Sequence, residues 1–164
     1  MTTWVNPYNA VSGAVVTAAN LDTYYTDLTV VGEAWVAYTP AWTAVTTNPV
    51  LGNGTLTGRY RKTGFTVDVA IELLMGSTTT YGSGTYLFSM PATSRTYPLA
   101  YYPLGLALLR DDSANLQRNR VVGWSSTTVV FLSDQDGVGV TNLVPFTFAV
   151  TDRILLHFRY ESAA

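Results

Sequence analysis

The stretch that most suggests chemistry is residues 50–64, VLGNGTLTGRYRKTG, in which glycines surround a basic cluster. A phosphate-binding loop would need a specific glycine spacing and a helix after the loop. Here the spacing of the first three glycines is G-x-G-x-x-x-G, and the residues that follow alternate as in a strand. The sequence therefore predicts a turn that enters a hairpin, with Asn53 and Gly54 supplying positive φ, and not a nucleotide site.

The basic cluster begins with Arg59 and Arg61, which share the polar face of a predicted strand. Asp68 and Glu72 have the corresponding polar positions on the next predicted strand, so we expect cross-strand ion pairs on a solvated face. A second reading keeps Arg59 and Arg61 as surface-binding residues that hold an acidic sugar or a neighbouring subunit. Both readings remain open at the level of the sequence.

Catalytic chemistry has few candidate residues. The single histidine, His157, lies in a predicted strand, and the chain has no cysteine and no G-x-S-x-G nucleophile motif. Most acidic residues fall in predicted loops, where their convergence cannot be read from spacing: Asp111, Asp112, Asp134, Asp136 and Asp152. The DQDG segment at 134–137 lacks the later ligands of a calcium loop and predicts a turn. We expect no enzyme activity, no metal and no cofactor.

Aromatic residues are abundant, with 4 Trp and 11 Tyr. Trp35 stands at the entry to the β-region and is a candidate contact for oligomerisation or anchoring. Tyr101 and Tyr102 precede a proline and are candidate surface-binding residues. Such rings bind sugars in some proteins and serve as core or interface anchors in most.

Composition limits the class of protein. The chain has 164 residues, of which 48% are apolar and only 12% are charged, which is enough for one packed domain. Its net charge of −2 argues against a nucleic-acid partner. The start of the chain has no basic region typical of a signal peptide, and its longest apolar run, 97–109, is too short for membrane insertion.

From residue 34 onward the hydrophobic pattern has a period of two, most clearly in Phe65–Leu73, with a predicted turn at Thr63-Gly64 before it. Turn signals separate many short strands, so we predict an all-β, antiparallel sandwich or jelly-roll-like domain at 34–164. The other predicted strands are Trp35–Tyr38, Ala41–Val45, Thr55–Lys62, Thr85–Met90, Leu99–Leu109, Arg120–Trp124, Val129–Leu132, Phe146–Val150 and Ile154–Tyr160.

Residues 1–33 form a predicted N-terminal arm with one short helix. Thr17 can cap the helix and Gly32 can end it, and the apolar positions between them follow helical spacing: Leu21, Tyr24, Tyr25 and Leu28. A helix of this length is marginal alone, so its apolar face must pack on something. That partner is either its own β-domain or, as we predict for these residues together with Trp35, other copies or a larger assembly.

Several segments in order resemble structural proteins of tailed bacteriophages. VTAANLDTYYTDL at 16–28 is similar to their opening helix, and YTPAWT at 38–43 follows Trp35 as in their tryptophan-led segment. NPVLGNGTLTGRYRKTGFTVDVAIEL at 48–73 and GSTTTYGSGTYLFSMP at 76–91 look like β-modules of minor tail proteins, fibre tips and related virion-surface proteins, particularly of phages that infect actinobacteria. The resemblance covers about residues 16 to 91.

This resemblance implies a non-enzymatic structural component of the virion surface, made in the host cytoplasm and assembled as a homotrimer with other capsid or tail proteins. Two placements stay open: a capsid decoration protein and a minor-tail or fibre-tip protein with receptor binding. The alternative from another class is a carbohydrate-binding module that contacts host-surface glycans.

Overall fold

The computed structural model describes residues 34–99, 101–133 and 138–163. The predicted N-terminal helix, with Leu21, Tyr24, Tyr25 and Leu28, lies outside these ranges, as does the predicted DQDG turn at 134–137. The predicted division of the chain at residue 33 remains a prediction.

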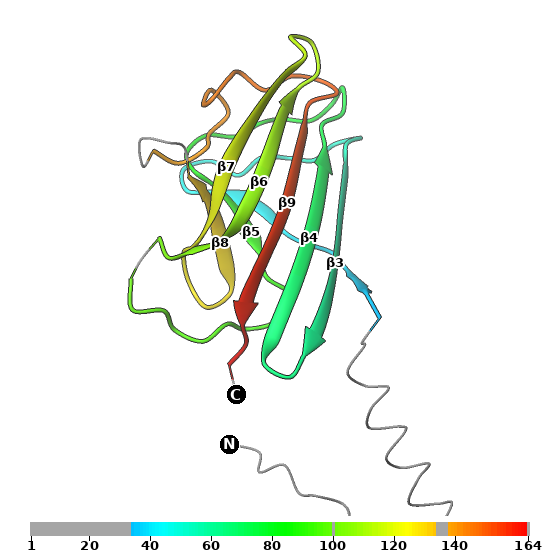
Figure 1. The fold of residues 1–164 in the computed structure, drawn as a ribbon. Coiled ribbons are helices and arrows are strands. Elements are labelled where there is room, and N and C mark those ends of the chain that lie inside the picture. Colours follow the sequence, from blue (N-terminus) through cyan, green and yellow to red (C-terminus); the bar gives the residue numbers. More distant parts are fainter. Residues whose placement is uncertain (1–33, 100, 134–137, 164) are drawn as a thin grey trace, which may run out of the picture.

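The described part is all-β and contains nine strands, as Figure 1 shows. They are β1 (Val36–Tyr38), β2 (Trp42–Ala44), β3 (Thr55–Thr63), β4 (Thr66–Leu74), β5 (Tyr86–Ser89), β6 (Pro103–Asp111), β7 (Leu116–Trp124), β8 (Val129–Ser133) and β9 (Arg153–Glu161). Every pairing between them is antiparallel. The predicted all-β, antiparallel class is therefore confirmed.

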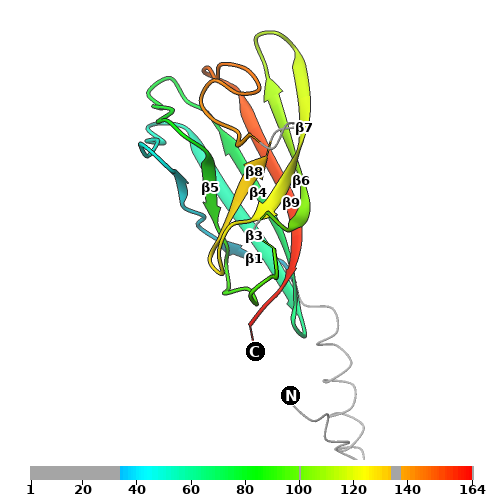
Figure 2. The same cartoon turned by 90° about the vertical axis from the view of Figure 1, so that its left-hand side faces the viewer.

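The strands form one sheet in the order β1-β3-β4-β9-β6-β7-β8-β5-β2. The sheet curls, so that β5 and β8 face β3, β4 and β9 across the interior (Figure 2). Its two edge strands, β1 and β2, follow each other in the chain with only residues 39–41 between them. The backbone N–H of Ser89, at the end of β5, donates to the Ala41 carbonyl at 3.0 Å, which ties this connection to the second edge.

The core lies between the facing parts of the curled sheet. Alternate residues of β4 point inward and are buried: Val67, Val69, Ile71 and Leu73. Opposite them, the Trp42 ring meets the Tyr86 ring edge-on with centroids 5.2 Å apart. Because burial of one such side chain stabilises a fold by about 1.5–3 kcal/mol, this inner face holds the domain together.

Nine of the ten predicted strand segments contain a strand, and Phe146–Val150 does not. Its aromatic residues pack from a loop onto the core, with the Phe148 ring 4.8 Å from Phe146 and 5.8 Å from Tyr86. The apolar pattern there reflects burial by the loop and not a ladder of backbone hydrogen bonds. The predicted strand at Leu99–Leu109 begins only at Pro103.

Two turns differ from the predictions by one residue. The β3–β4 turn consists of Gly64 and Phe65, because Thr63 and Thr66 are already paired. Gly64 has a φ of 60°, and Phe65 is 46% exposed instead of joining the inner face of β4. In the earlier turn the positive φ lies at Gly52, and not at Asn53 or Gly54.

We predict that Gly105→Ala lowers the free energy of unfolding by about 2–3 kcal/mol. Gly105 lies against β9, where a methyl group would overlap the His157 carbonyl and the Cα of Phe158. Since those atoms are backbone, no rotamer change relieves the overlap. Chemical denaturation measures the effect.

Gly64→Ala is the matched control. Open space surrounds Gly64, so the methyl group costs only the left-handed backbone strain of about 1 kcal/mol. An equal or larger loss for Gly64→Ala would contradict the packing described at Gly105.

Candidate functional site

The outer face of the sheet carries its side chains in rows set by strand register. One row runs Arg61, Asp68 and Arg159 across β3, β4 and β9. The next row contains Arg59, Ala70, His157, Leu106 and Val121, and the third contains Thr57, Glu72, Leu155, Leu108 and Asn119. Residues from five strands thus meet on one surface.

Asp68 organises the first row. Its carboxylate accepts hydrogen bonds from Arg159 Nε at 2.6 Å and Arg61 Nε at 3.0 Å. The side chain is only 9% exposed, and the hydrogen bond from Arg159, followed by that from Arg61, lowers its pKa. The predicted pairing of the basic cluster with Asp68 is confirmed for Arg61. Glu72 instead contacts Arg153 of β9, at 3.8 Å.

Trp35 joins the two candidate arginines in one cluster. The guanidinium carbons of Arg59 and Arg61 lie 5.2 and 5.4 Å from the centre of the Trp35 ring. The ring remains 37% exposed. The predicted anchor residue and the predicted surface-binding arginines therefore share one patch at the β1 edge, held by cation–π contacts.

The two candidate tyrosines pack on different neighbours. Tyr101 meets Phe131 edge-on at 4.9 Å and is 70% exposed, while Tyr102 stacks on Tyr97 at 4.7 Å. Tyr102 lines a small hollow that also includes Arg159. Tyr102 and Arg159 of the charged row thus border the same hollow, whereas Tyr101 packs on Phe131 of β8.

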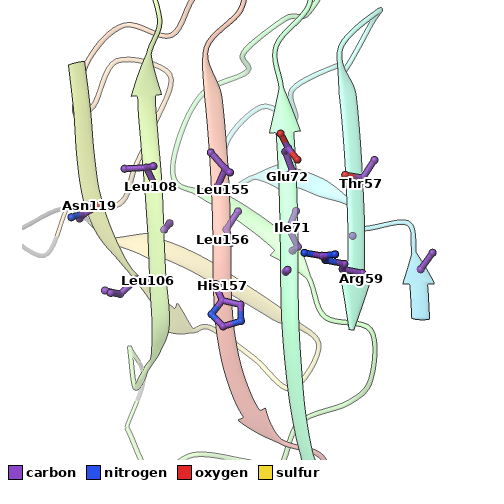
Figure 3. Close-up of a pocket in the computed structure, with 14 residues that line it drawn as sticks. Thr57, Arg59, Ile71, Glu72, Leu106, Leu108, Asn119, Leu155, Leu156 and His157 are labelled. Carbon is purple, nitrogen blue, oxygen red and sulfur yellow. The ribbon is translucent and has the colours of Figure 1, made fainter. Parts of the chain in front are cut away.

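Residues of the second and third rows line a hollow on the outer face, which we call the outer groove (Figure 3). It has a volume of about 740 Å³, and its lining includes Arg59, Ala70, Leu106, Leu155 and His157. Arg59 extends from β3 toward β4, and His157 projects from β9, the strand on the other side of β4 (Figure 3). Among the described residues, Arg59 forms no ion pair with a carboxylate.

The sequence pattern alone does not connect His157 and the outer leucines with Arg59. His157 lies on the exposed face of its strand, and the next residue, Phe158, is buried. However, β3, β9 and β6 are far apart in the chain, and their order in the sheet is not written in the period-two pattern. Leu106 gave one signal, since an exposed leucine at an outer position breaks the polar-out pattern.

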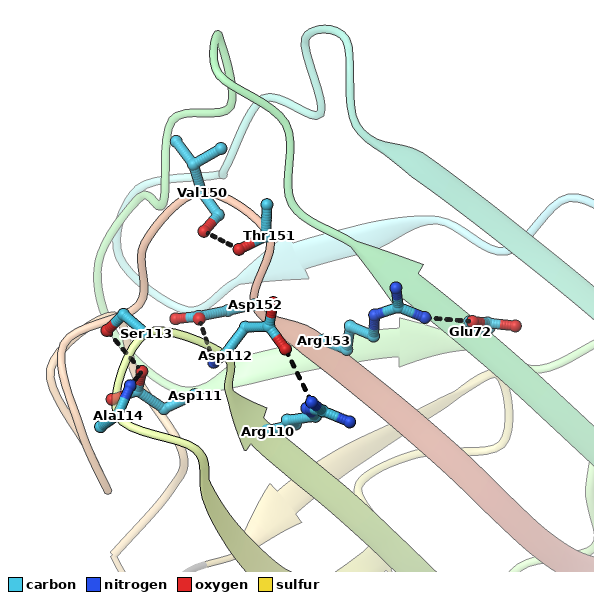
Figure 4. A network of polar contacts seen from close by, with 10 residues as sticks. All are labelled: Glu72, Arg110, Asp111, Asp112, Ser113, Ala114, Val150, Thr151, Asp152 and Arg153. Atoms are coloured by element: carbon cyan, nitrogen blue, oxygen red, sulfur yellow. Dashed lines mark hydrogen bonds and ion pairs between the residues drawn. The ribbon is translucent and has the colours of Figure 1, made fainter.

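Three of the loop carboxylates considered for catalysis, Asp111, Asp112 and Asp152, have structural contacts, and Asp134 and Asp136 lie outside the described residues (Figure 4). Asp152 is fully buried and accepts hydrogen bonds from the backbone N–H groups of Ala149, at 2.7 Å, and Asp112, at 3.0 Å. Burial raises the pKa of Asp152. Asp111 accepts from Ser113 Oγ and the Ala114 N–H, and the latter bond is the main cause of its lowered pKa.

The described part of the chain contains neither a candidate metal site nor a membrane-spanning helix. No group of three or more potential ligand residues within it could hold a metal ion. None of its elements is a helix long and apolar enough to cross a membrane.

Comparison with known proteins gives one similarity of note. The chain is 31% identical over 117 residues, 70% of its length, to the "Mu-like prophage FluMu defective tail fiber protein" of Haemophilus influenzae. It spans only 18% of the length of that relative. No family model and no solved structure matches the chain. The similarity is to a phage tail protein and supports the relation to tailed phages that the sequence resemblance implied.

We predict that Asp68→Asn lowers the free energy of unfolding by about 1 kcal/mol at pH 7, because it weakens two ion pairs. The loss is no larger because both arginine partners are partly exposed to solvent. A lowered folded-state pKa gives stability that is fully present above the unfolded pKa, about 3.9, and is lost as pH falls through the folded value. The difference between variant and wild type should therefore shrink below about pH 4.

Denaturation at pH 7 and pH 3 tests this sign. Glu72→Gln serves as the control, since its 3.8 Å contact joins two half-exposed side chains and should change stability little. If Asp68→Asn costs the same at both pH values, the ion pairs are not the source of the effect.

A second prediction concerns Asp152. Replacing it with Ala removes the buried acceptor shared by the Ala149 and Asp112 N–H groups, so we expect a loss of about 2–4 kcal/mol of unfolding free energy. Asp111→Ala, at an exposed turn, should cost less. Comparable losses for the two variants would show that Asp152 does not hold the loops together.

Proposed function

We infer that this protein is a non-enzymatic structural component of a phage virion, a surface module of the tail. The observation that carries the proposal is the similarity to a tail fibre protein over 70% of the chain. The same similarity favours a minor-tail or fibre-tip placement over capsid decoration. Its partners would then be other virion proteins.

The arrangement of the domain supports a module attached at one end. The start of β1 and the end of β9 both lie toward the lower end of the domain in Figures 1 and 2. The long loops around residues 45–54, 76–84 and 141–152 lie at the opposite end. A domain whose connections leave from one end can present its outer face and its far loops away from the particle.

Self-association through the N-terminal arm is part of this proposal. Three copies would associate as a homotrimer through the apolar side chains of Leu21, Tyr24, Tyr25 and Leu28. Trp35 would extend this contact to the β-domain. In support, Trp35 is more than one third exposed yet fixed by two arginines, as expected for an anchor residue at an interface.

A non-enzymatic role is supported by the contacts of the loop carboxylates. Asp152 and Asp111 accept backbone hydrogen bonds, and Asp112 pairs with Arg110 at 2.9 Å. These groups maintain loops, so they are poorly placed to serve as a general acid and base.

Labelling of intact particles tests the placement. An antibody or gold label against the purified chain should decorate the tail or its tip in electron micrographs. Decoration of the head would overturn the tail proposal in favour of capsid decoration. Absence of the chain from purified virions would overturn the structural role altogether.

Sedimentation tests the oligomer. We expect the full chain to sediment as a trimer at micromolar concentration and the Leu21→Ser/Leu28→Ser variant as a monomer, because the variant loses the apolar stripe of the arm. Asp22→Asn, on the same segment, should stay trimeric. A trimer that persists in the serine variant would place the contact elsewhere.

A further inference from the structure

The outer groove combines features that proteins use to hold a small polar ligand. Its volume of about 740 Å³ lies within the usual range for ligand sites. Apolar side chains of Ala70, Leu106 and Leu155 share the groove with polar groups from other strands. Leu106 is 63% exposed, so this part of the sheet offers apolar surface to solvent.

The polar groups of the groove have spare hydrogen-bonding capacity. Within the described chain, the side chains of Thr57, Asn119 and His157 form no hydrogen bond with one another or with other residues. An amide, a hydroxyl and an imidazole can together donate to and accept from a ligand that carries hydroxyl groups. Beside them, exposed apolar surface suits the C–H face of a sugar ring.

The charge in the groove favours an anion. Arg59 has no carboxylate partner in the described part of the chain, whereas Arg61, two residues on, binds Asp68. Glu72, the acidic residue of the lining, is offset by Arg153 at 3.8 Å. A guanidinium binds a carboxylate through two parallel hydrogen bonds, and the Trp35 ring beneath Arg59 restricts its motion.

The geometry leaves room for that anion. Arg59 and His157 occupy the same row on strands that flank β4, so their backbones are about 10 Å apart. The residue between them is Ala70, whose methyl group fills little of the gap. A carboxylate above Ala70 can therefore meet Arg59 on one side while the rest of the ring lies toward His157 and Leu106.

We propose that the outer groove binds an acidic monosaccharide unit, such as a uronic acid within a glycan, with Arg59 holding its carboxylate. The proposal deepens the function proposed above and rests on it for context, since a tail module meets the glycans of a host envelope. The binding residues are Arg59 and His157, which flank the floor formed by Ala70.

The test is titration of the purified full-length chain with oligogalacturonate, followed by NMR or calorimetry. Galactose oligomers of the same length, which lack the carboxylate, provide the ligand control. We expect binding of the acidic oligomer only. Arg59→Ala should weaken it by about 10- to 100-fold, the value of a charge-assisted pair. Arg118→Ala, an exposed arginine outside the groove, should leave it unchanged.

Two further variants test separately the hydrogen bonds of Arg59 and the space above Ala70. Arg59→Lys keeps the charge but not the paired hydrogen bonds, so it should bind with intermediate affinity. Ala70→Leu fills the space between Arg59 and His157 and should abolish binding while Arg59 is present. Thermal unfolding of each variant shows whether the fold is retained.

The remaining outcomes would overturn the proposal. Equal binding of acidic and neutral oligomers, or no binding at millimolar concentration, excludes an acidic-sugar site. If sulfate displaces the oligomer at equal concentration, the groove binds anions in general and is not specific for a sugar. Dimerisation that is lost on Leu106→Ser makes this face an interface between copies. None of these results affects particle labelling, so the tail proposal can fail or stand separately.

Discussion

The connection between the two edge strands is the constraint on which the rest of the structure depends. β1 and β2 lie at opposite edges of a nine-stranded sheet, yet only residues 39–41 separate them in sequence. The sheet can satisfy both pairings only by curling until its edges approach. Gly58 makes this possible, because a Cβ there would collide with the Tyr38 ring and Pro40. Ser89 then ties the connection from the other side through its backbone N–H and its hydroxyl group.

Curling separates an inside from an outside and so gives each strand residue its environment. Inward positions of β4 and β9 become a dry core, with Leu73 and Ile154 fully buried. Outward positions align in rows across five strands, and their content varies along the strands. Of the three rows, the one nearest the β3–β4 turn pairs two arginines with Asp68. The next two mix leucines with polar side chains, among which those of Thr57, His157 and Asn119 form no hydrogen bond within the described chain. The groove is therefore a consequence of register and of which residues the chain places opposite one another.

Much of the inner face could be predicted from sequence, and little of the outer surface could. The alternation in 66–74 specifies a strand and its buried side, because the alternation of side chains between the two faces does not depend on which strands pair with it. Strand order does not follow from the period, so the placement of Arg59 and His157 on either side of Ala70 could not be predicted. The strand predicted at Phe146–Val150 is wrong for a related reason: a loop that covers the core needs apolar residues, such as Phe146 and Phe148, just as a strand does. Phe65 fitted the alternation but forms part of the turn, where Gly64 supplies the positive φ.

The contrast between Arg59 and Arg61 shows how register assigns different roles to similar residues. Both lie on the outer side of β3, and both contact Trp35. Opposite Arg61 is Asp68, so its charge is satisfied within the fold, and opposite Arg59 is Ala70. A polar face that serves only solvation does not require one of these two arginines to lie opposite an aspartate and the other opposite an alanine. Because the arginine opposite the alanine is oriented by an aromatic ring and borders a hollow, its charge is available to something outside the chain.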